Sequence, residues 1–170
     1  MVELYFENIS DEELDYDFDC VSLAKQVISY ALKKFNCKEK AEVSLYIVSE
    51  AYIKEVNKEN RGIDKVTDVL SFPNLEFDEP GDLSFTEDEA SFYEYHDPES
   101  NNLILGDIII CKKRMEEQAI SYEHGNKREF AFLVIHSILH LLGFDHIEED
   151  DRVLMEDKQK EILDELDIKR

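Results

Sequence analysis

Apolar residues recur at intervals of three and four along several segments of the chain, a spacing that predicts amphipathic helices. The first predicted helix covers residues 20–35, and either Asp19 or Ser22 can cap its first turn. Ser49 can cap a second helix that ends near Gly62, because glycine accepts the left-handed backbone that ends helices. Three further helices are predicted late in the chain, at residues 112–124, 127–142 and 151–166.

Strands are predicted where apolar residues alternate with others or run together between turn formers. Four such segments occur, at residues 2–6, 43–48, 69–72 and 103–111. The third ends at Pro73, which has no N–H to donate to a neighbouring strand. Residues 74–100 carry turn formers, many acids and no clear periodicity, so we expect a long acidic loop or hairpin insertion there.

The order of these elements indicates one α+β domain over residues 1–170, with a small mixed four-stranded sheet covered by about five helices. A chain of this length can bury roughly 70% of the surface that it exposes when unfolded. It does not need a metal for stability, so a bound metal is expected to serve chemistry instead.

The chain carries 41 Asp and Glu residues against 19 Lys and Arg, a formal net charge of −22. The excess lies in residues 1–19, 74–100 and 148–170, and the two segments between them are almost neutral. A local cationic groove is therefore compatible with the overall acidity. With neither a secretory signal nor an apolar run of membrane-spanning length, a cytoplasmic protein is expected. Three widely spaced cysteines fit reduced, mostly buried thiols: Cys20, Cys37 and Cys111.

The most specific chemical signal is the segment HSILHLLGFDH. His136 and His140 are four residues apart, so on a helix they project from one face about one turn apart. Gly143 can reverse the chain after the helix and return His146 to the same point. Three imidazoles suit zinc or another divalent transition metal and leave a fourth position open, as in catalytic sites. Lone histidines are more often satisfied core residues, which is the interpretation for His96 and His124.

The histidine and glycine spacing also matches the zinc-peptidase pattern HExxHxxGxxH. That pattern has its general base, a glutamate, directly after the first histidine, and this chain has Ser137 there. A serine of ordinary pKa cannot take a proton from water on the metal, so a peptidase mechanism lacks its base.

Four blocks together resemble the YbeY family of metal-dependent, single-strand-specific endoribonucleases: NKENRG (57–62), TDVLSFP (67–73), LGDIIIC (105–111) and HSILHLLGFDH (136–146). The resemblance implies a zincin-like fold, metal binding by the three histidines, and a functional Arg61 in the cleft. It also implies action on the 3′ region of small-subunit ribosomal RNA, with ribosomal proteins or an assembly GTPase as partners. Ser137 and Phe144 depart from the glycine and tyrosine usual in the family.

Under this interpretation, zinc acidifies water and polarises a phosphoryl oxygen, and the Arg61 guanidinium stabilises the negative charge of the transition state. Asp145 either orients a histidine or moves a proton, or it only forms the turn. Two alternatives stay open: a metallopeptidase-like hydrolase, and a non-catalytic module whose metal ties helices together. A set of cations either lines a phosphate track or forms solvated helix faces: Lys54, Lys58, Arg61, Lys65, Lys112, Lys113, Arg114, Lys127 and Arg128.

Overall fold

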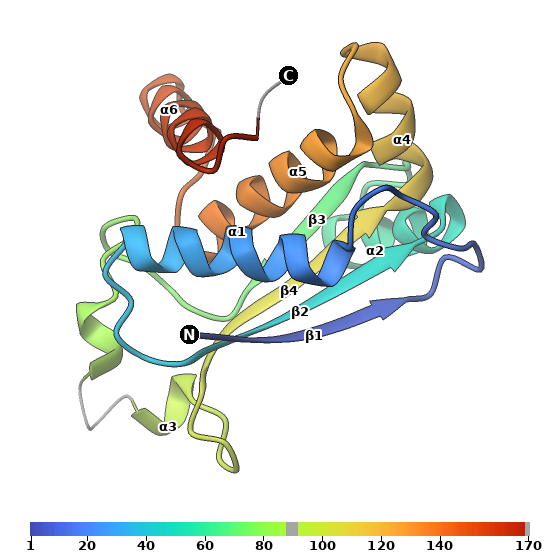
Figure 1. Cartoon of the computed structure of the whole chain (residues 1–170). Helices are drawn as coiled ribbons and strands as arrows, with labels where there is room; N and C mark the ends of the chain where they lie inside the picture. The colour runs from blue at the N-terminus through green and yellow to red at the C-terminus, as the bar shows by residue number, and fades with distance from the viewer. Residues whose placement is uncertain (88–91, 169–170) are drawn as a thin grey trace.

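The computed structural model describes residues 1–87 and 92–168, in which four strands form a single sheet (Figure 1). The strands are β1 (Val2–Asn8), β2 (Ala41–Val48), β3 (Val69–Pro73) and β4 (Leu103–Cys111). Their order is β1-β2-β4-β3, with β1, β2 and β4 mutually parallel and β3 antiparallel to β4. The predicted α+β class with a mixed four-stranded sheet is therefore confirmed.

Six α-helices occur in the described part of the chain: α1 (Cys20–Lys34), α2 (Glu50–Arg61), α3 (Phe92–Tyr95), α4 (Lys112–Ser121), α5 (Asn126–Leu141) and α6 (Glu149–Glu165). Five of them were predicted. No periodicity indicated α3 or the 3-10 turn Ser84–Glu87, both of which lie in the acidic segment 74–100. Helix α4 ends earlier than expected, because Glu123 adopts a left-handed φ of 56° just beyond it. None of these helices has the length and hydropathy of a transmembrane span.

Caps fix where the first two long helices begin and end. The Asp19 carboxylate accepts a hydrogen bond from the Ser22 backbone N–H at 2.7 Å, so Asp19 is the cap of α1 and Ser22 is not. The Ser49 hydroxyl accepts from the Tyr52 backbone N–H at 3.3 Å, as predicted for α2. Helix α2 ends at Gly62, whose φ of 69° is left-handed. This stop leaves Arg61 in the last turn of the helix.

The two faces of the sheet pack against different helices. Leu45, Ile108 and Ile110 point into the main core, where they meet α1, α5 and α6, and Figure 1 shows α1 and α5 running across this face. The alternate residues Val48 and Ile109 point the other way and form a smaller cluster with α2. Burial on both faces explains why β4 is almost continuously apolar. All three cysteines are free, with Cys20 and Cys111 buried and Cys37 partly buried.

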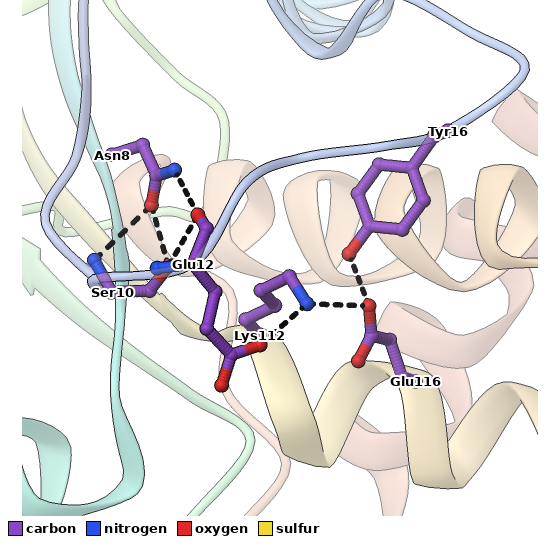
Figure 2. Close-up of polar contacts among 6 residues, drawn as sticks. All are labelled: Asn8, Ser10, Glu12, Tyr16, Lys112 and Glu116. Atoms are coloured by element: carbon purple, nitrogen blue, oxygen red, sulfur yellow. Dashed lines mark hydrogen bonds and ion pairs between the residues drawn. The ribbon is translucent and has the colours of Figure 1, made fainter.

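The acidic residues before α1 are tied to α4 by a network around Lys112 (Figure 2). The Lys112 ammonium lies 2.8 Å from a Glu12 carboxylate oxygen and 3.0 Å from a Glu116 oxygen, and the residue is only 9% exposed. The Tyr16 hydroxyl donates to Glu116 at 2.7 Å, and burial raises the pKa of Tyr16 far above its ordinary value. The Lys112 ammonium is therefore neutralised by carboxylates of the same chain.

The acidic segment 74–100 is anchored at two places. Nε2 of His96 lies 2.6 Å from a Glu39 carboxylate oxygen, and the other Glu39 oxygen accepts from the Thr86 hydroxyl at 2.6 Å. The His96 side chain is 1% exposed, which confirms it as a satisfied core histidine. Near the other end, the Gly81 N–H donates to the Leu142 carbonyl at 2.8 Å. The segment thus packs against the turn that follows α5.

Candidate metal centre

The turn after α5 brings the three histidines together. Gly143 has a left-handed φ of 84°, and a Cβ at this position would lie 2.7 Å from the Phe77 side chain. Only glycine satisfies both constraints without rearrangement. The reversal returns His146 toward His136 and His140, as the spacing predicted, and one nitrogen from each ring lies within 4.8 Å of the others.

The hydrogen bonds of the rings define which nitrogens are free. Nδ1 of His140 lies 2.9 Å from the Phe144 backbone carbonyl, and Nδ1 of His136 lies 2.7 Å from Oε1 of Gln159. A carbonyl oxygen only accepts, so each Nδ1 carries a proton and each Nε2 presents a lone pair. Those two Nε2 atoms are only 3.1 Å apart. Facing lone pairs at this distance repel unless a cation lies between them, so the ring arrangement fits a metal ion.

The surroundings of His136 and His140 favour the neutral imidazole, which is the form that binds a metal. Burial, together with the neighbouring His136 and His146, lowers the pKa of His140 to about 4. Burial also lowers the pKa of His136. In addition, the carboxyl end of α5 carries the negative pole of the helix dipole, which favours a cation. Three converging imidazoles in these surroundings could hold a divalent metal ion.

The histidines lie in a cleft of about 1260 Å³ between α5, α6, β3 and the end of α2. Arg61 lines this cleft, and its side chain is exposed. No ion pair joins Arg61 to another residue within 1–87 or 92–168. Two other cleft cations are engaged with acids: Arg152 with Glu149 and Glu156, and Lys160 with Asp164.

Other residues singled out from the sequence have varied surroundings. Asp145 lines the cleft, and its Oδ1 accepts from the His146 backbone N–H at 2.7 Å, which is the turn-forming role. Its contribution to catalysis stays a prediction. Ser137 is fully buried and faces away from the cleft, so it cannot replace the missing peptidase glutamate. Phe144 holds His140 through its backbone carbonyl, a contact that does not depend on the Phe144 side chain.

The extended phosphate track is not supported, because most of its cations are paired with acids. Lys113 and Arg114 both contact Glu50, at 2.8 Å and 3.3 Å, and Lys112 is engaged as described above. Lys54 and Lys58 flank Asp64, at 3.7 Å and 3.6 Å. Of the nine candidate residues, only Arg61 and Arg128 line the cleft.

Two polar residues of the site carried no predicted role. Gln159 comes from α6, 23 positions beyond the histidine that it orients, in a helix whose sequence marks no position as special. Asp68 lines the cleft beside β3, and its Oδ2 accepts from the Gln118 amide at 3.0 Å. Asp68 lies in the block TDVLSFP, so the family resemblance could have pointed to it. No sequence pattern pointed to Gln159.

Replacing Gln159 with leucine is expected to weaken zinc binding about 10- to 100-fold, because His136 loses the acceptor that fixes its tautomer and orientation. Competition with a chromophoric chelator measures the affinity. Gln159→Glu retains an acceptor and is expected to bind zinc at least as tightly as the unmodified chain. Gln26→Leu, on the exposed face of α1, is the matched control. Equal zinc affinity for Gln159→Leu and this control would contradict the assigned role.

Glu129, in the first turns of α5, makes a buried contact with His124, which precedes the helix. Nε2 of His124 lies 3.0 Å from Oε2 of Glu129, and their side chains are 6% and 2% exposed. The other Glu129 oxygen has no hydrogen-bond partner in the described chain. Burial, together with the charge of Asp68, raises the pKa of Glu129 to about 7. His124 is therefore a satisfied core histidine, as predicted.

Glu129→Gln is expected to stabilise the fold at pH 8 and to have little effect at pH 5. The folded-state pKa of Glu129 is above its unfolded value, so ionisation penalises the folded chain increasingly from about pH 4.5 to 7. At about 1.4 kcal/mol for each pKa unit, the gain at pH 8 is at most about 3 kcal/mol. Urea unfolding at both pH values measures it, with Glu55→Gln on exposed α2 as control. A loss of stability at pH 8 would refute this pKa assignment.

Three converging histidines beside an open cleft, on a mixed sheet covered by helices, are the arrangement of a metal-dependent hydrolase. The family model "Endoribonuclease YbeY" matches residues 6–167, and the chain belongs to this family. It is 46% identical to the endoribonuclease YbeY of Agathobacter rectalis, over 93% of this chain and 94% of that protein. The corresponding protein of Lachnoclostridium phytofermentans is 42% identical, over 94% and 96%. The solution structure of TM1509 from Thermotoga maritima matches with a TM-score of 0.58 and 28% identity, over 97% of this chain and 88% of that one.

Proposed function

We propose that this chain is a zinc-dependent endoribonuclease that cleaves single-stranded RNA at the three histidines. The observation that carries the proposal is the pair of Nε2 atoms 3.1 Å apart at the wall of an open cleft. Membership of the YbeY family supports the reaction type. His136, His140 and His146 are the proposed metal ligands.

A zinc-class ion in this site supplies Lewis-acid polarisation of a phosphoryl oxygen and lowers the pKa of water. Arg61 has a guanidinium without a carboxylate partner in the described chain and faces the same cleft. It binds the non-bridging oxygens in a bidentate manner and stabilises the charge that they gain in the transition state. Asp145, beside His146, holds a proton released by the attacking oxygen.

The size of the cleft supports a preference for single strands. Its volume of about 1260 Å³ only slightly exceeds that of pockets for small molecules, which is about 300–1,000 Å³. A few unstacked nucleotides fit into this space, whereas a duplex has to open first. The three histidines add no negative charge to the metal, so the centre remains attractive to phosphate.

The proposed natural substrate is ribosomal RNA, at the 3′ region of the small-subunit species, in the cytoplasm. The family resemblance supports this substrate, and it also suggests the small ribosomal subunit and assembly factors as partners. The peptidase alternative is disfavoured by the burial of Ser137. A purely structural metal is disfavoured by the position of the histidines in an open cleft.

The test compares a single-stranded RNA, the same RNA annealed to its complement, and an unstructured peptide. Zinc-loaded protein is expected to cleave the single strand, to spare the duplex and the peptide, to lose activity with a chelator, and to regain it with zinc. Peptide hydrolysis would favour the metallopeptidase alternative. RNA cleavage that persists without metal would overturn the proposal.

A further inference from the structure

Four residues at intervals of four form a stripe along α5: Arg128, Phe132, His136 and His140. Four residues amount to slightly more than one helical turn, so these side chains project from one face of the helix. All four line the cleft. The two histidines occupy the carboxyl half of α5, and an arginine and an aromatic ring continue the same face away from them.

Phe132 presents an aromatic ring to the cleft on the same helix face as His136. It is partly buried against the main core, whereas its sequence neighbours Ala131 and Leu133 are fully buried. Its ring lies within 23° of parallel to the His136 ring, with centroids 6.2 Å apart. An aromatic surface held rigidly at one edge and open at another can stack on a flat partner.

Arg128 is the second cleft cation without a carboxylate partner among residues 1–87 and 92–168. One of its guanidinium N–H groups donates to the Ile168 backbone carbonyl, which holds the side chain at the cleft. A guanidinium has five N–H donors, so others remain for an anion. Because Arg152 and Lys160 are paired with acids, Arg128 and Arg61 are the cleft cations best placed to bind phosphate.

The spacing along α5 matches a nucleic acid strand. Arg128 and His136 are separated by eight residues, or about 12 Å along the helix axis, and Phe132 lies halfway between them. Stacked nucleotides rise about 3.4 Å each and spread further when they unstack, so this distance spans two or three nucleotides.

We propose that Phe132 and Arg128 form a second RNA subsite, in which Phe132 stacks on a nucleobase next to the scissile phosphodiester and Arg128 binds a phosphate beyond that base. This inference rests on the proposed function and specifies which groups of the RNA, a nucleobase and a phosphate, the cleft binds. A base has to leave its own stack to reach Phe132, so the subsite also adds to discrimination against duplexes.

The first test uses metal-free protein and a single-stranded RNA with 2-aminopurine at successive positions. Binding is expected to quench the probe at one or two adjacent positions, and Phe132→Leu is expected to abolish that quenching and weaken binding about 5- to 10-fold. Phe6→Leu is the matched control, because Phe6 is partly buried against the same core but lies on β1 outside the cleft. It is expected to behave like the unmodified chain.

The second test uses an abasic nucleotide at the quenched position and zinc-loaded protein. Phe132→Leu is expected to lower kcat/KM about 5- to 10-fold on the intact RNA and to have no effect on the abasic RNA. Equal loss on both substrates would show a structural role and overturn the subsite. If the unmodified chain cleaves RNA and Phe132→Leu matches it in binding and cleavage, the subsite alone fails. If the unmodified chain neither binds nor cleaves RNA, the proposed function fails as well.

The phosphate contact of Arg128 is tested through salt dependence. Loss of one phosphate contact to a single strand is expected to reduce the slope of log K against log salt by about 0.7. Arg128→Gln is expected to show this reduction. Lys25→Gln, at an exposed position of α1, is expected to retain the full slope. Arg128→Lys, which keeps the charge, is expected to restore most of it. An unchanged slope for folded Arg128→Gln would overturn the assignment of Arg128.

Discussion

His140→Ala is expected to empty the metal centre and to lower cleavage of single-stranded RNA about a thousand-fold or more. The ring supplies one of three proposed ligands, and among the described residues the group of potential ligands consists of these three histidines alone. A metal's stabilisation of transition-state charge is worth several kcal/mol, and about 1.4 kcal/mol corresponds to a factor of ten in rate. Elemental analysis gives the metal content, and cleavage of a labelled oligonucleotide gives the rate.

A second histidine provides the control for that substitution. His96 is buried more than 40 positions earlier in the chain, in contact with Glu39 and outside the cleft. Folded His96→Gln is expected to retain zinc and activity, although it loses some thermal stability. If His140→Ala bound zinc and cleaved RNA normally, the three histidines would not be the catalytic centre.

Arg61→Ala is expected to lower cleavage about 100- to 1,000-fold while leaving zinc content and melting temperature unchanged. The guanidinium lines the cleft but makes no ion pair in the described chain, so its truncation breaks no contact that stabilises the fold. Loss of a single donor to developing negative charge typically costs a factor of this size. Single-turnover cleavage with saturating protein separates the chemical step from RNA binding.

Two further variants separate the shape of the Arg61 side chain from its charge. Arg61→Lys keeps the charge but not the planar pair of donors, so only partial recovery is expected. Lys33→Ala removes an equivalent charge at an exposed position of α1 and is expected to cleave normally. Loss of zinc from Arg61→Ala, or an undiminished rate, would exclude the proposed role.

With a net charge of −22, binding of an RNA substrate depends on cations that lack acidic partners, and in the described part of the chain Arg61 and Arg128 meet this condition in the cleft. Glu12 and Glu116 surround Lys112, and Glu50 lies between Lys113 and Arg114. Because these cations are paired with acids, the cationic surface that the sequence predicted is limited to the cleft. Affinity for RNA is therefore expected to depend on a few cleft contacts more than on long-range attraction.

Local patterns were sufficient to predict most of the secondary structure and the convergence of the histidines. The helical spacing of His136 and His140 and the position of Gly143 depend on residues within one segment, which is why they could be read directly. The helical caps Asp19 and Ser49 are local in the same sense.

Features that join distant segments could not be predicted. Lys112 and Glu12 are 100 positions apart, and the partner of Asp68 is 50 positions away on α4. Gln159 meets His136 only because α6 folds back across α5. Polar residues on an acidic helix give no sign of which one will face inward, so this part of the centre required the three-dimensional structure.

The most direct measurement of the central claim is X-ray absorption at the zinc edge of the zinc-loaded chain. The expected spectrum has three imidazole nitrogens at about 2.0–2.1 Å and one further light atom, without sulfur. His140→Ala is expected to lose this signature and His96→Gln to keep it. A zinc ion held by other ligands, or no bound zinc when the metal is in excess, would contradict the claim that the three histidines form an open metal centre.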